Sequence, residues 1–284
     1  MKSIFTLLST ILISILFFTP SFAQESAEET EIQNPWTVEF RGGLNGSQAA
    51  YSNWQQGGVN TIAVTGNTNF KASYKKDVWG YTLNTALTYG RARIGDDNRK
   101  TDDEINIRNR FDYFFSTDEW SARFNLNFLS QFDRGFNADD VKVSQFFAPA
   151  YLTQTLGVAY TPTNFFNVST SLAMRQTFVN DTDLSVRYGL KPGETFQNEF
   201  GFSLEANFER EIMENVRYVS RLETFTNFQK SPNSSDFTFK NELVAQINSY
   251  LSTNLQITLL YNDDVSKDLQ VRQILSVGLT FRFI

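Results

Sequence analysis

The chain has no cysteine and no histidine among its 284 residues. The lack of cysteine excludes disulfide scaffolds, zinc ribbons and iron–sulfur clusters. The lack of histidine excludes catalytic dyads and triads built on imidazole, together with most transition-metal sites. Basic residues are also few, 25 against 31 acidic ones, and nucleic-acid binding needs a positive surface. We therefore expect no catalytic residue, no cofactor, no metal site and no nucleic-acid partner.

Long hydrophobic runs are missing from most of the chain, although aromatic side chains are abundant. Phe contributes 28 residues, Tyr 11 and Trp 4, which is 15% of the chain. The mean hydropathy is nevertheless −0.33, so the apolar residues must be dispersed along the chain. No serine–lysine or carboxylate pair stands out among the polar residues, and an enzyme is not expected.

The one long apolar run lies near the N-terminus. A short basic start is followed by apolar residues 4–18 and by a small-x-small site that ends at Ala23. This pattern predicts a cleaved signal peptide over 1–23, because the run of about 15 residues is shorter than the ~20 that a spanning helix needs. Residues 24–35 carry four glutamates and few apolar residues, which predicts an acidic periplasmic linker.

From residue 36 onward the chain alternates with period two, which is typical of β-strands with two different faces. About twelve such segments can be counted, and most have 12–16 residues, whereas ~5–6 is usual in soluble sheets. A tilted membrane-spanning strand needs ~9–11 residues in the hydrocarbon alone. The segments are 36–45, 59–74, 79–93, 101–115, 119–132, 146–160, 165–178, 195–209, 215–229, 236–249, 252–262 and 268–283.

The connections between these segments alternate between short turns and longer stretches such as 46–58, 133–145 and 179–194. This asymmetry is typical of outer-membrane barrels with short periplasmic turns and longer extracellular loops. We therefore predict an all-β fold, a single transmembrane antiparallel up-and-down β-barrel of about 12 strands over 36–284. Ten or fourteen strands remain alternatives if 133–145 or 179–194 contain strands or the neighbouring segments do not.

Charged residues within the segments lie almost entirely in the phase opposite to the aromatic residues. A charge that faces lipid at the midplane costs ~2–4 kcal/mol, so this phase is expected to face the barrel lumen. The predicted lumen-lining residues are Arg41, Lys71, Arg108, Arg110, Asp112, Arg123, Arg175, Glu199, Glu205, Arg217, Arg221, Glu223, Lys240, Glu242 and Arg272. With Arg282 and the acids at strand ends added, the two signs nearly balance, which argues against strong ion selectivity. The set could line an open polar channel, or its members could pair and partly fill the lumen.

The last strand and one acidic segment carry two further signals. Gly278, Phe281 and Phe283 resemble the terminal strand by which bacterial outer-membrane barrels are recognised for assembly. Five acids lie between Asp96 and Glu104, in what we expect to be one external loop. Oxygen ligands at this density could bind Ca²⁺, but no calcium-loop spacing is present, so a solvated acidic loop is the preferred interpretation.

Several short motifs resemble one family in order and spacing. They are Tyr51-Ser52-Asn53-Trp54-Gln55-Gln56-Gly57-Gly58, Tyr89-Gly90, Lys100-Thr101-Asp102-Asp103, Gln131-Phe132 with Gly135, and Ala148-Pro149-Ala150-Tyr151-Leu152. The chain from about residue 36 to the end is similar to Bacteroidota envelope proteins grouped as domain of unknown function 3078. The resemblance implies an outer-membrane β-barrel of a Gram-negative bacterium and carries no known activity. The signature loop with Asn53, Trp54, Gly57 and Gly58 could fold inward as a gate, although an interfacial Trp beside a turn is the simpler interpretation.

These observations predict an integral outer-membrane protein, most simply a porin-like channel for passive movement of small polar solutes. The alternative is a non-conducting structural or accessory barrel that binds an unidentified envelope protein. In both cases the expected partners are outer-membrane lipid, lipopolysaccharide and, during biogenesis, the barrel-assembly machinery.

Overall fold

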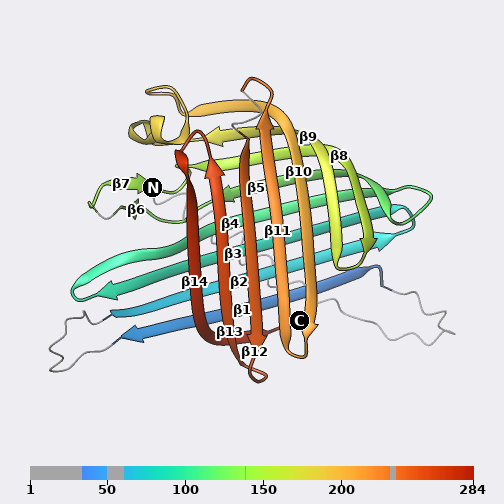
Figure 1. Ribbon diagram of the computed structural model, residues 1–284, viewed down its shortest axis with the longest axis horizontal. Helices are drawn as coiled ribbons and strands as arrows, with labels where there is room; N and C mark the ends of the chain where they lie inside the picture. The colour runs from blue at the N-terminus through green and yellow to red at the C-terminus, as the bar shows by residue number, and fades with distance from the viewer. Residues whose placement is uncertain (1–33, 50–60, 138, 231–234) are drawn as a thin grey trace, which may run out of the picture. The chain divides into compact units, whose positions relative to one another are not determined.

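Twelve long antiparallel strands form the wall of a closed barrel in the computed structural model, which describes residues 34–49, 61–137, 139–230 and 235–284 (Figure 1). The strands have 11–18 residues each. Their bounds are β1 Trp36–Ala49, β2 Thr61–Lys76, β3 Trp79–Ile94, β4 Asp97–Phe114, β5 Trp120–Ser130, β8 Ala150–Thr163, β9 Phe166–Phe178, β10 Phe196–Met213, β11 Val216–Asn227, β12 Asp236–Gln246, β13 Leu251–Asn262 and β14 Ser266–Arg282. The predicted fold class and the count of twelve wall strands are confirmed.

The barrel closes because β1 pairs with both β2 and β14. Arg41 lies opposite Arg282 on one side and opposite Asn69 on the other. Every wall strand pairs with its sequence neighbours except β5 and β8, which pair with each other across an excursion. That excursion contains the short strands β6 Gly135–Phe136 and β7 Lys142–Ser144, which form a hairpin outside the wall. Closure leaves no wall strand with an unpaired edge.

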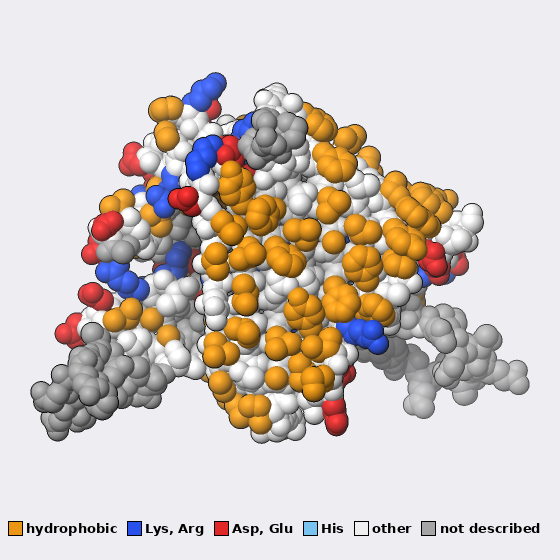
Figure 2. All heavy atoms as spheres, viewed as in Figure 1, with side chains coloured by type: hydrophobic (Ala, Val, Ile, Leu, Met, Phe, Trp, Pro, Cys, Tyr) orange, Lys and Arg blue, Asp and Glu red, His pale blue; other side chains and the backbone are white. Residues whose placement is uncertain are grey.

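The outward face of the wall is apolar. Exposed hydrophobic side chains gather over β10–β14 at the front of Figure 2, and on β14 they include Val271, Leu275 and Val277. Leu275 is 70% exposed and Leu172 on β9 is 65% exposed. Apolar surface in water costs ~25 cal/mol per Å², so a contiguous outward face of this kind is built to contact an apolar surrounding. No helix within the described ranges is long and apolar enough to cross a membrane.

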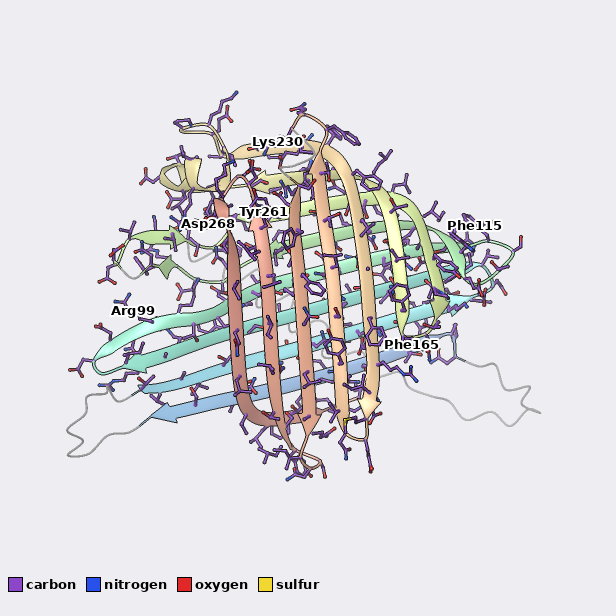
Figure 3. All side chains as sticks on the ribbon, in the orientation of Figure 1. Arg99, Phe115, Phe165, Lys230, Tyr261 and Asp268 are labelled. Atoms are coloured by element: carbon purple, nitrogen blue, oxygen red, sulfur yellow. The ribbon has the colours of Figure 1, made fainter. Side chains whose placement is uncertain are left out.

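One end of the barrel carries a belt of outward aromatic pairs. Trp36 packs on Tyr74 at 5.1 Å between ring centroids, Trp79 on Tyr113 at 5.0 Å, and Trp120 on Tyr160 at 4.6 Å. These strand ends are joined by short turns, and Phe115 and Phe165 mark two of the turns in Figure 3. Amphipathic rings at one level are typical of a membrane interface.

The opposite end carries the longer connections, and Arg99, Lys230 and Asp268 mark it in Figure 3. The connection between β9 and β10 contains two 3₁₀ turns, η1 Thr182–Leu184 and η2 Val186–Tyr188. Not all connections at this end are long, because β3 and β4 are joined by residues 95–96 alone. The predicted loop 46–58 is partly strand, since β1 extends to Ala49, and its remaining residues lie mostly outside the described ranges.

The acidic segment is not one external loop, and this expectation was wrong. Asp97 already pairs with Ile94, so Asp102, Asp103 and Glu104 lie within β4. The β3–β4 hairpin continues to Asp97 because polar residues can form the hydrogen bonds of a β-ladder beyond the apolar belt. The alternation of a strand then sends neighbouring carboxylates to opposite faces. In the described part of the chain, no group of three or more acids could hold a metal ion.

Candidate functional site in the barrel interior

The predicted lumen-lining residues share one face of the wall. Residues directly opposite each other in an antiparallel ladder point to the same side. Arg175 lies opposite Glu199, Glu205 opposite Glu223, and Arg221 opposite Lys240. The registers extend this face around the barrel, and it carries Arg41, Lys71, Arg108, Arg110, Asp112, Arg123, Arg175, Glu199, Glu205, Arg217, Arg221, Glu223, Lys240, Glu242 and Arg272.

Contacts between distant strands show that this face points inward. Arg108 on β4 lies 2.7 Å from Glu223 on β11. Lys240 on β12 lies 3.4 Å from Glu104 on β4. In the wall, β4 pairs only with β3 and β5, and both β11 and β12 belong to the opposite side of the strand order. Such contacts can form only through the lumen, so ion pairs bridge the interior.

A third ion pair joins β4 to β14. Arg272 on β14 lies 2.7 Å from Asp102. The contacts of β4 with β11, β12 and β14 therefore cross the lumen at three levels of the same strand. They use Asp102, Glu104 and Arg108, which alternate along one face. The sequence predicted which face of its strand each residue lies on. It did not predict these partners, because they come from strands far along the chain.

A compact ionic cluster lies against the wall at β4 and β5. Arg123 donates to Asp112 at 2.7 Å, and both side chains are only 4% exposed. Arg110 lies 3.1 Å from the same carboxylate, and the Ser121 hydroxyl donates to it at 3.0 Å. Arg123 also reaches Asn167 on β9 at 3.1 Å. Buried ions of this kind are tolerated only because each has several charged or hydrogen-bonding partners.

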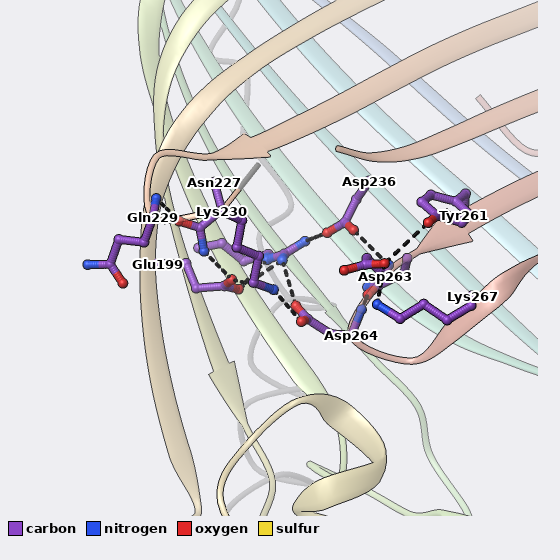
Figure 4. Close-up of polar contacts among 11 residues, drawn as sticks. Glu199, Asn227, Gln229, Lys230, Asp236, Tyr261, Asp263, Asp264 and Lys267 are labelled. Carbon is purple, nitrogen blue, oxygen red and sulfur yellow. Dashed lines mark hydrogen bonds and ion pairs between the residues drawn. The ribbon is translucent and has the colours of Figure 1, made fainter. Parts of the chain in front are cut away.

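A second ionic cluster lies at the loop end of the lumen, as Figure 4 shows around Glu199, Lys230, Asp236 and Asp264. Arg175 on β9 lies 2.8 Å from Glu199 on β10 and 2.6 Å from Asp236 on β12. Lys230 is paired with Asp264 and lies 3.8 Å from Glu199. The network therefore joins β9, β10, β12 and two loop-end connections.

A polar cavity of about 380 Å³ lies beside this cluster, lined in part by Lys191, Glu199, Asn227 and Lys230. Sequence analysis included Glu199 and Arg175 but not Lys230, Asp236 or Asp264. Asp236 lies four residues before Lys240 on β12, so it shares the inward face, and this spacing could have identified it as a lumen-facing residue. Lys230 and Asp264 lie in connections, where no alternation indicates a direction.

The connections at the loop end form a small cap with its own apolar core of Ala148, Val179, Leu184 and Leu190. The Tyr188 hydroxyl donates to the Val143 carbonyl at 2.7 Å and so joins the two connections. Lys142 donates a hydrogen bond to Asp181, which caps η1, and this bond holds the pKa of the Asp181 carboxyl below its usual range. The cap is thus fixed by both packing and charge.

Inward charges are accessible on the wall formed by β14, β1 and β2, as they also are on β4 and β11, where Arg110 is 38% and Arg221 37% exposed. The side chain of Arg41 is 36% exposed and that of Arg272 is 45% exposed. Asn67 is exposed although it points inward. Lys71 and Arg282 make no ion pair and no side-chain hydrogen bond with any residue that the structure describes. These inward side chains are therefore exposed within the lumen rather than buried in it.

The residues of the predicted assembly signal close the barrel. Gly278 is buried against Asn45 of β1, and Phe283 stacks on Phe40 with 5.0 Å between ring centroids. Phe281 faces outward near Tyr250. Recognition of this strand by assembly machinery stays a prediction. The signature loop with Asn53, Trp54, Gly57 and Gly58 lies outside the described residues, as do the signal peptide and most of the acidic linker.

Residues 47–136 match the model of a family described as "Protein of unknown function (DUF3078)". The resemblance found in the sequence is confirmed over this segment. It includes the Asn-Trp-x-x-Gly-Gly stretch, whereas the Ala148–Leu152 motif lies beyond it. No curated protein matches the chain.

Several solved barrels have a similar arrangement of strands. An outer-membrane channel from Pseudomonas putida F1 matches with 7% identity and a TM-score of 0.42, covering 92% of this chain and 99% of that one. The NanC porin matches with 10% identity and a TM-score of 0.38, covering 85% and 98%. The CymD monoaromatic hydrocarbon channel matches with 11% identity and a TM-score of 0.36, covering 89% of each chain. At such identities, what this barrel does has to be inferred from its own side chains.

Proposed function

We propose that this protein is an outer-membrane channel for passive movement of small polar solutes. The observation that carries the proposal is the accessibility of inward polar side chains on β14, β1 and β2, among them Arg41, Asn67 and Arg272. A barrel of eight strands can be filled by side chains, whereas one of sixteen leaves an aqueous channel. Twelve strands lie between these cases, so the width of the path depends on how the inward side chains are arranged.

The apolar outward face and the aromatic belt support the membrane location. Lipid would contact residues such as Leu275 and Leu172, while Trp36 and Trp79 would lie at the interface. Lipopolysaccharide would surround the loop end, and the assembly machinery would read the strand that ends in Phe281 and Phe283. These partners belong to the proposal.

The alternative function is a non-conducting accessory barrel that binds a partner in the envelope. The ion pairs that cross the lumen favour it, because Arg108–Glu223 and Glu104–Lys240 occupy interior space. The two functions differ in whether water and ions pass through the barrel.

Single-channel recording of the refolded full mature chain in a planar lipid bilayer decides between them. A channel should give discrete, reproducible conductance steps. The double variant Arg108→Ser/Glu223→Ser removes one bridge without leaving an unpaired charge, and its steps should be larger than those of the native protein. Silence from a barrel whose folding is verified by circular dichroism and heat-dependent electrophoretic mobility would contradict the channel and favour the accessory barrel.

A further inference from the structure

We infer that the conducting path is off-centre, along the wall of β14, β1, β2 and β3, and that it favours small anions over cations. The inference rests on the proposed channel function and adds its solute class. It follows from three features of the interior: one part of the wall is filled, another part is open, and the open part carries positive side chains that have no ion pair with a described residue.

The part of the wall formed by β5, β8 and β9 is filled. Its inward residues are small, yet they are buried, as with Ser169 at 4% and Ala159 at 0% exposed. Arg123 on β5 reaches Asn167 on β9 and therefore passes over β8, where Gly157 is its direct neighbour. Small residues on this wall thus accommodate long charged side chains instead of leaving space for water.

The part of the wall formed by β14, β1 and β2 is open at the level of Gly43 and Gly278. A Cβ atom on Gly43 would lie 2.4 Å from Asn67 Oδ1, and one on Gly278 would lie 2.0 Å from Asn45 Oδ1. The two amides therefore lie flat over glycines of the neighbouring strands and do not extend across the lumen. They contact each other at 3.5 Å. Hydroxyl and amide side chains continue this lining on β3, whose inward residues between positions 82 and 88 carry no charge.

The charge of this open wall is mainly positive. Arg41 lies directly opposite Arg282, and Lys71 lies opposite Glu39 in the register of β1 and β2. The ion pair of Glu39 is with Arg41, at 2.7 Å. Lys71 and Arg282 are therefore left without an ion pair among the described residues.

Several inward acids elsewhere are neutralised by ion pairs, as described for Glu104, Asp112, Glu199 and Glu223. Glu205 and Glu242 keep their charge, since they accept hydrogen bonds from the neutral amides of Asn207 at 2.8 Å and Asn254 at 2.6 Å and make no ion pair with a described residue. These two acids lie on β10 and β12, whereas Lys71 and Arg282 lie on β2 and β14, so the near balance over the whole interior hides a local excess of cations along β14, β1 and β2. A path lined by one sign of charge concentrates ions of the opposite sign.

The test is the reversal potential of single channels under a KCl gradient near ~0.1 M salt, where the Debye length is ~10 Å. We expect a Cl⁻ to K⁺ permeability ratio of about 3 or more for the native barrel. Lys71→Gln should lower this ratio at least about twofold, and Lys71→Gln/Arg282→Gln should bring it close to about 1. The matched control is Lys76→Gln, which removes the same charge from the outward face of the same strand and should leave the ratio unchanged.

The outcomes separate the two proposals. A folded barrel that never conducts overturns the channel function and this inference with it. A conducting barrel that prefers K⁺, or whose ratio does not respond to Lys71→Gln, overturns the inference and leaves the channel intact. An equal effect of Lys76→Gln would also overturn it, because selectivity would then come from charge outside the path. If Arg282→Gln hinders assembly through the last strand, Lys71→Gln alone provides the test.

Discussion

Arg108 and Glu223 lie 115 positions apart in the sequence, and their side chains meet at 2.7 Å through the lumen. Arg108 Nη1 donates to Glu223, and its Nε donates to Asn106 Oδ1 at 3.0 Å on its own strand. The pair therefore connects two opposite walls by one well-defined contact, and it can be tested by substitution.

Arg108→Gln should destabilise the folded barrel, because Glu223 would lose its main partner while Arg221, at 4.0 Å, offers only a distant one. A double-mutant cycle of Arg108→Gln and Glu223→Gln should give a coupling energy of about 1–3 kcal/mol. This is below the range for fully buried pairs because the Glu223 side chain is 34% exposed to lumen water. Denaturant unfolding in lipid vesicles measures it, and a coupling near zero would mean that the bridge is not formed in the membrane.

Gly278→Ala should weaken closure of the barrel. A Cβ at this position would lie 2.7 Å from the Leu44 carbonyl oxygen, and the backbone of β1 cannot move away without losing its pairing with β14. We expect a loss of about 1–3 kcal/mol, the usual cost of overpacking. Gly66→Ala is the control, since nothing lies within 4 Å of the added atom. The prediction fails if both variants unfold at the same denaturant concentration.

Leu275→Arg should impair insertion into lipid, because Leu275 lies midway along β14 on the outward face. A cation facing lipid near the midplane costs ~2–4 kcal/mol. Leu275→Gln introduces a polar side chain without a charge, and its cost in stability should be smaller than that of Leu275→Arg. Unfolding in vesicles of defined composition measures both changes, and a negligible effect of the arginine would mean that this face does not contact hydrocarbon.

The cap should loosen in acid. Lys142 holds the pKa of Asp181 below its usual range, so the carboxyl is charged in the folded cap over a wider range of pH than in the unfolded chain. A lowered pKa contributes stability above the unfolded value of about 3.9, and this contribution is lost as the pH falls through the folded value. The protection of the amides of residues 182–190 against hydrogen exchange, relative to the unfolded chain at the same pH, should therefore fall below about pH 4.

Asp181→Asn is the variant that isolates this charge. Its side-chain oxygen can still accept the hydrogen bond from the Asp183 amide, so the N-cap of η1 is kept while the ion pair with Lys142 is lost. The variant should show faster exchange at neutral pH and a weaker response to acid. An unchanged acid response would assign the effect to another group.

The alternation of the sequence determined much of this protein. A period of two over long segments is a local property, and it indicated the number of wall strands, their approximate bounds and which residues share a face. It missed that β4 begins at Asp97, because the strong polarity around Asp96 and Asp97 suggested a loop. Outside an apolar belt, nothing prevents polar residues from continuing a strand, so polarity alone does not mark where a strand ends.

Only the tertiary structure decided which inward charges are paired. The partners come from opposite walls, such as Arg108 with Glu223 and Glu104 with Lys240, and no local pattern relates residues so far apart. The sequence showed that acids and bases nearly balance in the interior. The closed barrel shows where they balance, since ion pairs across the lumen neutralise charges on β4, β11 and β12, whereas Lys71 and Arg282 have no ion pair with a described residue. Coulomb interactions depend on distance in space, and distance is set by how the wall closes on itself.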